Sequence, residues 1–236
     1  MEAYSFVTPE HSGTHMDAPV HFSKNGLRID EIPLSNHLVP GVVIDCTEKA
    51  SKDPDYLMSL EDVQKFEKEY GQIPQGAVVP MRTGWEQYWA DPDKFLGTEK
   101  DQAAEAPGGL GLGVKMHYPA MNATAVDWLI RNKDIKGIGL DTISADNIRN
   151  PTFPVHRRIC EDNRIIIENV RFGLFPKNIR NGFLLETLPM RIKHGTGGPT
   201  RVLGLIPSPS GANLPWNGVY SIIISILVWI ICSQVF

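Results

Sequence analysis

Short apolar runs bounded by turn residues recur along the chain and predict a series of strands. These runs cover residues 42–45, 77–82, 137–141, 164–170 and 201–206. Strands outnumber helical segments and do not alternate strictly with them. The pattern therefore predicts an α/β fold class, as one mixed domain over residues 1–207.

Two segments repeat their apolar residues at helical spacing. The first covers residues 60–70, between Ser59, which can cap a helix, and Gly71, which can end one. The second covers residues 124–132 and places three apolar side chains on one face. Between the two helices, residues 102–113 are rich in Ala and Gly and predict a loop near the site.

The end of the chain has a different composition. After Arg201 there is no Asp, Glu, Lys or Arg as far as Phe236, and residues 219–236 are almost wholly apolar. Eighteen such residues lie at the lower limit for crossing a bilayer. We therefore expect a linker over residues 208–218, then an apolar C-terminal tail helix over residues 219–236. A buried core helix or strand is the alternative.

This tail predicts attachment to a membrane. Residues 210–212 are small, and a spacer and an apolar terminus follow them, which is the pattern of a GPI-anchor signal. A plain membrane-spanning helix is the other interpretation. In both cases we expect a protein held at a membrane through its C-terminus, at the cell surface or in the secretory pathway.

Composition and charge exclude one class of partner. The chain has 236 residues, a net charge of −4 and no basic stripe, so nucleic acid is not an expected ligand. Its three cysteines form neither a disulfide framework nor a CxxC pair.

Three histidines and one aspartate fall within residues 11–21, at positions His11, His15, Asp17 and His21. Glycine and proline in this segment argue against a helix. In an extended chain, residues 11, 15, 17 and 21 share one face. Four polar groups on one face are costly to bury unless a ligand satisfies them. The cluster therefore predicts a metal site, and ordinary surface or core histidines are the alternative.

Ligand geometry adds a constraint on the backbone. In a straight strand His11 and His15 would stand about 13 Å apart. Two nitrogens bound to one ion at about 2.1 Å each cannot be so distant. The chain must therefore bend between them, and Gly13 is the residue that permits it. Together with Asp17, the two histidines then form a three-ligand site.

Two further candidates lie far downstream. Glu168 falls within the apolar run of residues 164–170, where a carboxylate is costly unless it is paired or bound to a cation. The alternative is that Glu168 faces solvent beside Arg171. His156 follows Phe153-Pro154-Val155 and is ambiguous by itself.

The order of these motifs resembles the cyclase-like metal-dependent hydrolases, the family of the kynurenine formamidase and isatin hydrolase type. Residues 11–21 match the metal motif of that family, His-x-Gly-Thr-His-x-Asp-x-Pro-x-His. Five later motifs follow in order and extend the similarity over most of residues 3–207. They are residues 82–89, 139–144, 153–156, 168–169 and 197–202.

The resemblance implies a mixed-sheet cyclase fold of the swivelling β/β/α type with a binuclear centre. His11, His15 and Asp17 would hold one divalent cation. Asp17 would bridge to a second cation held by His156 and Glu168. Mixed imidazole and carboxylate ligands suit zinc and also manganese, and two zinc ions are our expectation.

The resemblance also implies an activity. His21 would be a catalytic proton shuttle that titrates near neutrality, rather than a ligand. The isatin-cleaving branch has glutamine at the position of Glu168 and uses one manganese, so Glu168 favours the two-metal arrangement. We therefore expect an arylformamidase that converts N-formylkynurenine to kynurenine and formate. The alternatives are a hydrolase of another cyclic or aryl amide, such as isatin, and a non-catalytic, membrane-tethered metal-binding protein.

His21 separates these alternatives, because a purely structural site has no use for a free imidazole beside it. The remaining expectations concern partners and the N-terminus. A small-molecule amide is the expected substrate, and the family resemblance implies a homo-oligomer. Family members carry a segment ahead of the metal motif, whereas only ten residues precede His11 here. The short N-terminus therefore predicts a truncated gene model, an isoform or a degenerate protein, in which the metal ligands are retained.

Overall fold

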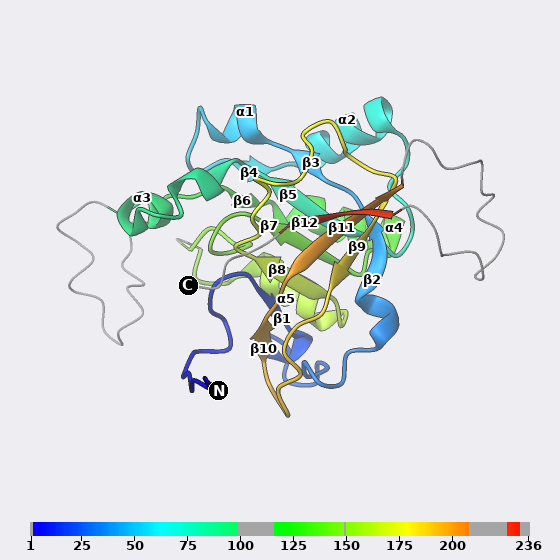
Figure 1. Cartoon of the computed structure of the whole chain (residues 1–236). Helices are drawn as coiled ribbons and strands as arrows, with labels where there is room; N and C mark the ends of the chain where they lie inside the picture. The colour runs from blue at the N-terminus through cyan, green and yellow to red at the C-terminus, as the bar shows by residue number, and fades with distance from the viewer. Residues whose placement is uncertain (1, 99–115, 149, 208–225, 232–236) are drawn as a thin grey trace.

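One large sheet organises the computed structural model, which describes residues 2–98, 116–148, 150–207 and 226–231 (Figure 1). Its strand order is β10-β1-β8-β7-β5-β2-β9-β11-β12, and β3 also pairs with β5. The strands are β1 (His15–Asp17), β2 (Leu38–Gly41), β3 (Ile44–Asp45), β5 (Val78–Arg82), β7 (Gly137–Leu140), β8 (Ile165–Glu168), β9 (Phe183–Thr187), β10 (Gly197–Pro199), β11 (Val202–Pro207) and β12 (Ile226–Ile231). A small second sheet pairs β4 (Leu57–Met58) with β6 (Ala120–Met121).

The centre of the large sheet is parallel and its flanks are antiparallel. Strands β2, β5, β7 and β8 run parallel to their neighbours in this group. On one flank β1 lies antiparallel between β8 and β10, and on the other β9 and β11 are antiparallel. The predicted mixed α/β fold class is confirmed.

Five α-helices accompany the sheet in the described ranges. They are α1 (Thr47–Ala50), α2 (Leu60–Tyr70), α3 (Pro92–Leu96), α4 (Ala123–Lys133) and α5 (Pro154–Glu161). Short 3₁₀ helices cover Pro19–His21 (η1), Leu34–Asn36 (η2) and Trp85–Tyr88 (η3). Helices α2 and α4 match the two predicted helices. Helix α2 has Ser59 as its N-cap, and Gly71, with a φ of 94°, follows its last turn.

The sheet separates two cores. On β8, Ile166 belongs to the core that α2, α4 and α5 cover. Its neighbours Ile165 and Ile167 point to the opposite face. There they pack with Phe183 and Leu185 of β9, because the sheet curls until its far strands cover its own second face (Figure 1). In this curled half-barrel, the candidate site lies on the face of β1 and β8 that is directed toward the helices.

Four of the five predicted strands are found as β5, β7, β8 and β11. Of the predicted strand over residues 42–45, only Ile44–Asp45 forms a strand (β3), and residues 42–43 lie between β2 and β3. Val43 donates its N–H to the carbonyl of Arg180, which lies in a loop, and this interrupts the ladder. Helix α5 was not predicted, although Pro154 in its first turn is a common start signal.

The predicted C-terminal helix is wrong for the residues that can be compared. Ile226–Ile231 forms strand β12, which pairs antiparallel with β11. Its Ile, Val and Trp residues have high strand propensity. Within the described ranges no helix is long and apolar enough to cross a bilayer, which contradicts the predicted membrane localisation. The predicted loop over residues 102–113, the linker over residues 208–218 and the small residues 210–212 lie outside the described residues.

The start of α2 provides a test of the fold. Asp62 accepts hydrogen bonds from Lys49 Nζ at 2.5 Å, Tyr56 Oη at 2.5 Å and the N–H of Ser59 at 2.7 Å. Burial alone would raise its pKa, but the bonds from Lys49 and Tyr56 outweigh burial and lower it. The stabilisation is therefore present above the unfolded pKa and is lost as pH falls through the folded one.

We predict that Asp62→Asn lowers the free energy of unfolding by about 1–3 kcal/mol near pH 7. The deficit should shrink between pH 7 and about pH 3, because the wild-type protein starts to lose this stabilisation once the pH falls below the unfolded pKa of about 3.9. Urea unfolding of the metal-free protein at both pH values measures this. Glu61→Gln, an exposed neighbour on the same helix, is the control. A deficit that stays constant with pH would contradict the assigned role.

Candidate metal centre

Strand pairing brings the first three candidate ligands to one place. In the β1–β8 ladder His15 lies opposite Glu168, and Asp17 lies opposite Ile166. Side chains of paired residues and of alternate residues share a face, so His15, Asp17 and Glu168 all point toward the helical side. His15, Asp17 and Glu168 are 3%, 1% and 5% exposed, so the carboxylates are almost removed from water.

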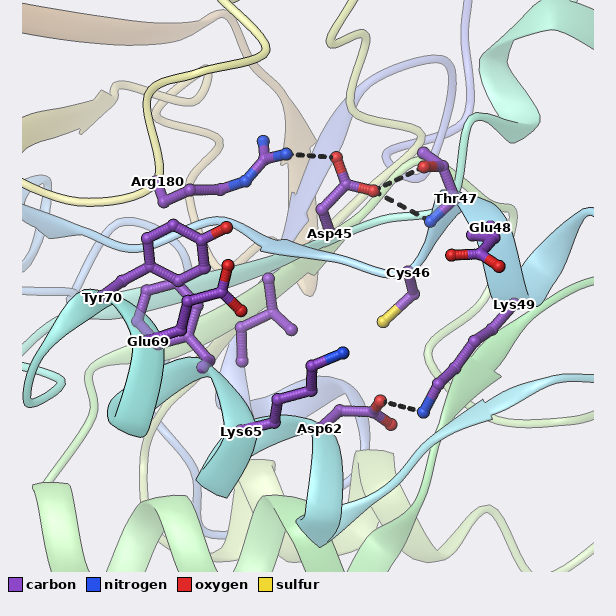
Figure 2. A pocket seen from close by; sticks show the side chains of 12 residues that line it. Asp45, Cys46, Thr47, Glu48, Lys49, Asp62, Lys65, Glu69, Tyr70 and Arg180 are labelled. Atoms are coloured by element: carbon purple, nitrogen blue, oxygen red, sulfur yellow. Dashed lines mark hydrogen bonds and ion pairs between the residues drawn. The ribbon is translucent and has the colours of Figure 1, made fainter.

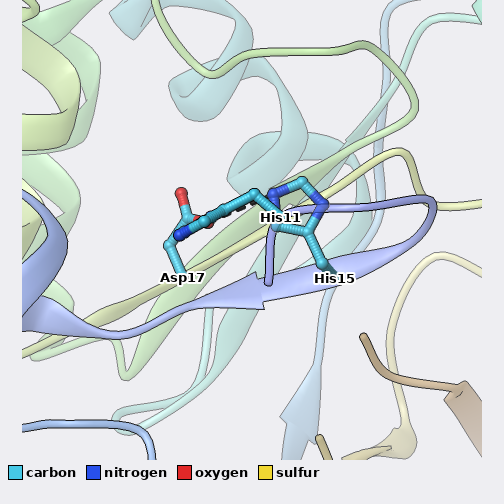
Figure 3. Close-up of side chains that lie close together, drawn as sticks. All are labelled: His11, His15 and Asp17. Atoms are coloured by element: carbon cyan, nitrogen blue, oxygen red, sulfur yellow. Dashed lines mark hydrogen bonds and ion pairs between the residues drawn. The ribbon is translucent and has the colours of Figure 1, made fainter. Parts of the chain in front are cut away.

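The predicted bend before β1 is confirmed. Gly13 has a φ of 62°, in the left-handed region, and no β-carbon to oppose it. The turn returns His11 over β1, where its Nδ1 lies 2.6 Å from Oδ1 of Asp17 (Figure 3). The same figure shows His15 reaching the cluster from the strand itself.

Helix α5 supplies the last candidate ligand. His156 lies in its first turn and is 3% exposed. Its Nε2 is 3.2 Å from Oε1 of Glu168 and 3.5 Å from Oδ2 of Asp17. Nε2 of His15 is 3.2 Å from Oδ1 of Asp17.

The side chains form two overlapping groups, and in each group the ligand atoms lie within 4.8 Å of one another. One group contains His11, His15 and Asp17, and the other contains Asp17, His156 and Glu168. The structure therefore brings together all five residues that the sequence analysis proposed as metal ligands, and Asp17 is common to both groups. Their role as metal ligands stays a prediction.

Hydrogen bonds on the outer side fix the tautomers of two histidines. Nδ1 of His15 donates to the carbonyl of Gly13 at 2.9 Å. Nδ1 of His156 donates to Asp146 at 2.7 Å, a carboxylate that also accepts the N–H of His156. Each Nε2 is then unprotonated in the neutral ring and faces the cluster.

His11 is fixed in the same way through a longer chain. The hydroxyl of Thr196 donates its one proton to Glu10 at 2.6 Å. Thr196 can therefore only accept from Nε2 of His11, 2.9 Å away. This leaves Nδ1 of His11 as a bare acceptor directed at Asp17.

This donor set fits a divalent cation. Imidazole lone pairs and ionised carboxylates face one another at distances of 2.6–3.5 Å, which is repulsive unless a positive charge lies between them. Oδ2 of Asp17 is buried and has no hydrogen-bond partner among the described residues. Imidazole nitrogen together with carboxylate oxygen suits zinc and manganese. The fit supports a divalent metal and specifies neither its identity nor its number.

In the protein without a cation, protons supply the positive charge. Burial would lower the pKa of His15, but the hydrogen bond and the charge of Asp17 outweigh burial and raise it to about 9. Burial likewise opposes protonation of His156, yet Asp146 and Asp17 raise its pKa. Metal binding at neutral pH therefore has to displace protons.

His21 lies beside the cluster, and its imidazole has no hydrogen-bond partner in the described part of the chain. Its ring stacks on His11 with centroids 4.1 Å apart and is 6.3 Å from the ring of His156. Partial burial lowers its pKa to about 4, against the charge of Asp17 and with help from His11 and His156. In the metal-free protein this shift favours the neutral ring, and the role of His21 as a proton shuttle stays a prediction.

Two half-buried aromatic rings adjoin the histidines. The ring of Phe22 lies 4.5 Å from that of His156 and 4.8 Å from that of His21. Phe153 lies 5.4 Å from Phe22 and immediately precedes α5. With exposed His21 and partly exposed His11, these rings form the accessible side of the cluster.

Several residues of the site were not recognised in the sequence. They are the outer partners Asp146 and Thr196 and the aromatic Phe22. Asn169, which contacts the turn at Gly13, was matched only as part of the motif at residues 168–169 and was given no role. Their types are common in loops, so only their position in the fold distinguishes them. The signal for Phe22 is its place directly after the metal motif.

A separate cavity of about 360 Å³ lies between β3, α1 and α2 (Figure 2). Its charged groups largely satisfy one another, as Arg180 pairs with Asp45 at 2.8 Å and Lys49 pairs with Asp62 at 2.5 Å. None of the clustered histidines lines it. The histidine and carboxylate cluster is therefore the better candidate for chemistry.

Comparison with known proteins agrees with this geometry. The Cyclase family model matches residues 2–147. The chain belongs to the cyclase family. Among its relatives, the isatin hydrolase of Roseibium aggregatum is 30% identical over 210 residues, which cover 85% of this chain and 73% of the relative. The kynurenine formamidase of Salinibacter ruber is 26% identical over 84% of this chain and 78% of its own.

Solved structures give the same assignment for the fold of this chain. A crystal structure of an isatin hydrolase bound to the product analogue thioisatinate superposes with a TM-score of 0.74 at 30% identity. The match covers 86% of this chain and 74% of that one. The resemblance read from the motifs is therefore confirmed, and these relatives are hydrolases.

We predict that Asp17→Asn empties the cluster of metal, because one carboxylate serves both groups of ligands. Affinity should fall more than about 100-fold, since loss of an outer partner alone typically costs 10–100-fold. Metal analysis after dialysis measures this, with circular dichroism as a check of folding. Asp55→Asn is the control, because Asp55 pairs with His117 at 2.9 Å outside the cluster. Wild-type metal content in Asp17→Asn would refute the shared-ligand arrangement.

Proposed function

We propose that this cyclase-family chain is a metal-dependent amide hydrolase that cleaves the bond between a carbonyl carbon and an aryl-substituted nitrogen. The observation that carries the proposal is the buried set of bare imidazole nitrogens and carboxylates beside a free, neutral imidazole. Its relatives support the bond type, because isatin and N-formylkynurenine both have an amide nitrogen on a benzene ring.

In this proposal the cluster is a binuclear site. His11, His15 and Asp17 hold one divalent cation, and Asp17, His156 and Glu168 hold a second, with zinc or manganese as the metal. Such cations supply a Lewis acid for the carbonyl oxygen and lower the pKa of a bound water. A homo-oligomer, expected from the resemblance, stays a prediction.

The chain itself moves the protons. Neutral His21 accepts a proton from the attacking water at a ring nitrogen and returns it to the departing aryl nitrogen. Its lowered pKa keeps the acceptor form available at pH 7 and makes the protonated form a better proton donor than an ordinary imidazolium. Asp146 and the carbonyl of Gly13 hold His156 and His15 in the tautomers that the site needs.

The aromatic side of the cluster favours an aryl substrate. Phe22 and Phe153 lie beside His156, where a benzene ring on the scissile nitrogen can pack against them. N-formylkynurenine is the first candidate substrate, because Glu168 is a carboxylate, as in the two-metal arrangement. Its hydrolysis consumes one water and yields kynurenine and formate.

Isatin is the second candidate, supported by the 30% identity to an isatin hydrolase over 85% of this chain. Hydrolysis of isatin opens a ring and releases one product, so the two activities are distinguishable by formate release. We predict that kcat/KM for N-formylkynurenine exceeds that for isatin by at least tenfold, about 1.4 kcal/mol in transition-state binding. The opposite preference would support isatin, and turnover of neither by metal-loaded protein would contradict the proposed activity.

We predict that His21→Ala lowers kcat by about 10²–10⁴-fold with metal content unchanged, because a proton shuttle is lost but no ligand. Single-substrate kinetics and metal analysis on the same samples measure both effects. His117→Ala, a half-exposed histidine outside the cluster, is the control. Loss of metal in His21→Ala would make His21 a ligand and exclude the role assigned to it.

A further inference from the structure

The ladder between β1 and β8 ends at the pair His15 and Glu168, which are both candidate ligands. Beyond this pair the two strands leave the sheet through residues in the left-handed region. Gly13 precedes His15 with a φ of 62°, and Asn169 follows Glu168 with a φ of 56°. Backbone pairing therefore cannot hold the two ligands together beyond this point.

Side-chain hydrogen bonds take the place of the ladder. Nδ2 of Asn169 donates to the carbonyl of Gly13 at 3.0 Å. In the reverse direction the hydroxyl of Thr14 donates to the carbonyl of Asn169 at 2.5 Å. We call these two hydrogen bonds between Asn169 and residues 13–14 the clamp. The N–H of Asn169 donates to the carbonyl of Thr142 at 3.0 Å, which anchors the clamp to the loop after β7.

Both ends of this clamp act on ligands. The carbonyl of Gly13 accepts from Asn169 and also from Nδ1 of His15, so the same atom sets the tautomer and the direction of that imidazole. At the other end Asn169 adjoins Glu168, whose Oε1 accepts the N–H of Ala145 at 2.9 Å. His15 belongs to one ligand group and Glu168 to the other.

The geometry points to Asn169 as a positioning residue that ties His15 to Glu168 and thereby sets the spacing of the two halves of the metal centre. This inference rests on the proposed function, in which the cluster binds metal. Asparagine suits the place for two reasons, because it tolerates left-handed backbone and its amide supplies a donor. Asn169 is 8% exposed, so water cannot easily replace the lost bond.

Two variants distinguish the role of the Asn169 side-chain amide from the role of its backbone conformation. Asn169→Asp keeps the shape and the tolerance of positive φ but turns an acceptor toward the carbonyl of Gly13. Asn169→Gly keeps the backbone conformation and removes the side chain. Asn163→Gly is the matched control, because Asn163 is an exposed asparagine with a φ of 54° in the loop before β8.

We expect both Asn169 variants to bind Zn²⁺ and Mn²⁺ about 10–100-fold more weakly than wild type, the usual effect of losing an outer partner of a ligand. Chelator competition measures affinity, and the rise in Tm on adding metal provides a second readout. Thr14→Val should also weaken metal binding, because it removes the hydroxyl. Thr14→Ser should bind metal as wild type does, because serine keeps the hydroxyl. Asn163→Gly should bind as wild type does.

Three results would overturn the inference, and they are distinguishable. Wild-type affinity in both Asn169 variants would overturn it while leaving the proposed metal centre intact. A lower Tm of the metal-free variants with an unchanged rise on adding metal would show a structural role only. Absence of metal binding by the wild-type chain would remove the proposed function and this inference together.

Discussion

The rest of the site depends on one electrostatic constraint, which is the burial of facing acceptors around Asp17. Outer hydrogen bonds leave bare nitrogens on His11, His15 and His156, and these nitrogens point at buried carboxylates. Such an arrangement is stable only if positive charge lies within it, as protons or as cations. The raised pKa values of His15 and His156 are the consequence when protons carry that charge.

The scaffold meets this constraint with short elements whose ends are fixed. Strand β1 has three residues, yet it pairs on both sides and places two ligands on one face. Helix α5 begins at the cluster, where Asp146 accepts its first N–H groups and also orients His156. Asn169 and Thr14 then continue the contact between β1 and β8 beyond the ladder.

The sequence grouped the candidate ligands better than it predicted the elements that carry them. Donor chemistry and the need for a bend at Gly13 follow from residue type and chain geometry, so His11, His15 and Asp17 could be grouped in advance. The contacts to His156 and Asp146 depend on long-range packing, so α5 and its carboxylate partner were not foreseen. The prediction for the tail was wrong because an apolar run rich in β-branched residues is compatible both with a membrane helix and with a buried strand. Ile226–Ile231 forms a strand. The pKa of His21 likewise depends on neighbours that only the fold supplies.

Anomalous diffraction from crystals grown with zinc or manganese tests the central claim most directly, because it locates ions without reference to activity. We predict two peaks that share Asp17, one bounded by His11 and His15 and the other by His156 and Glu168. A cluster without anomalous signal at saturating metal, or a peak that Asp17 does not contact, would contradict it.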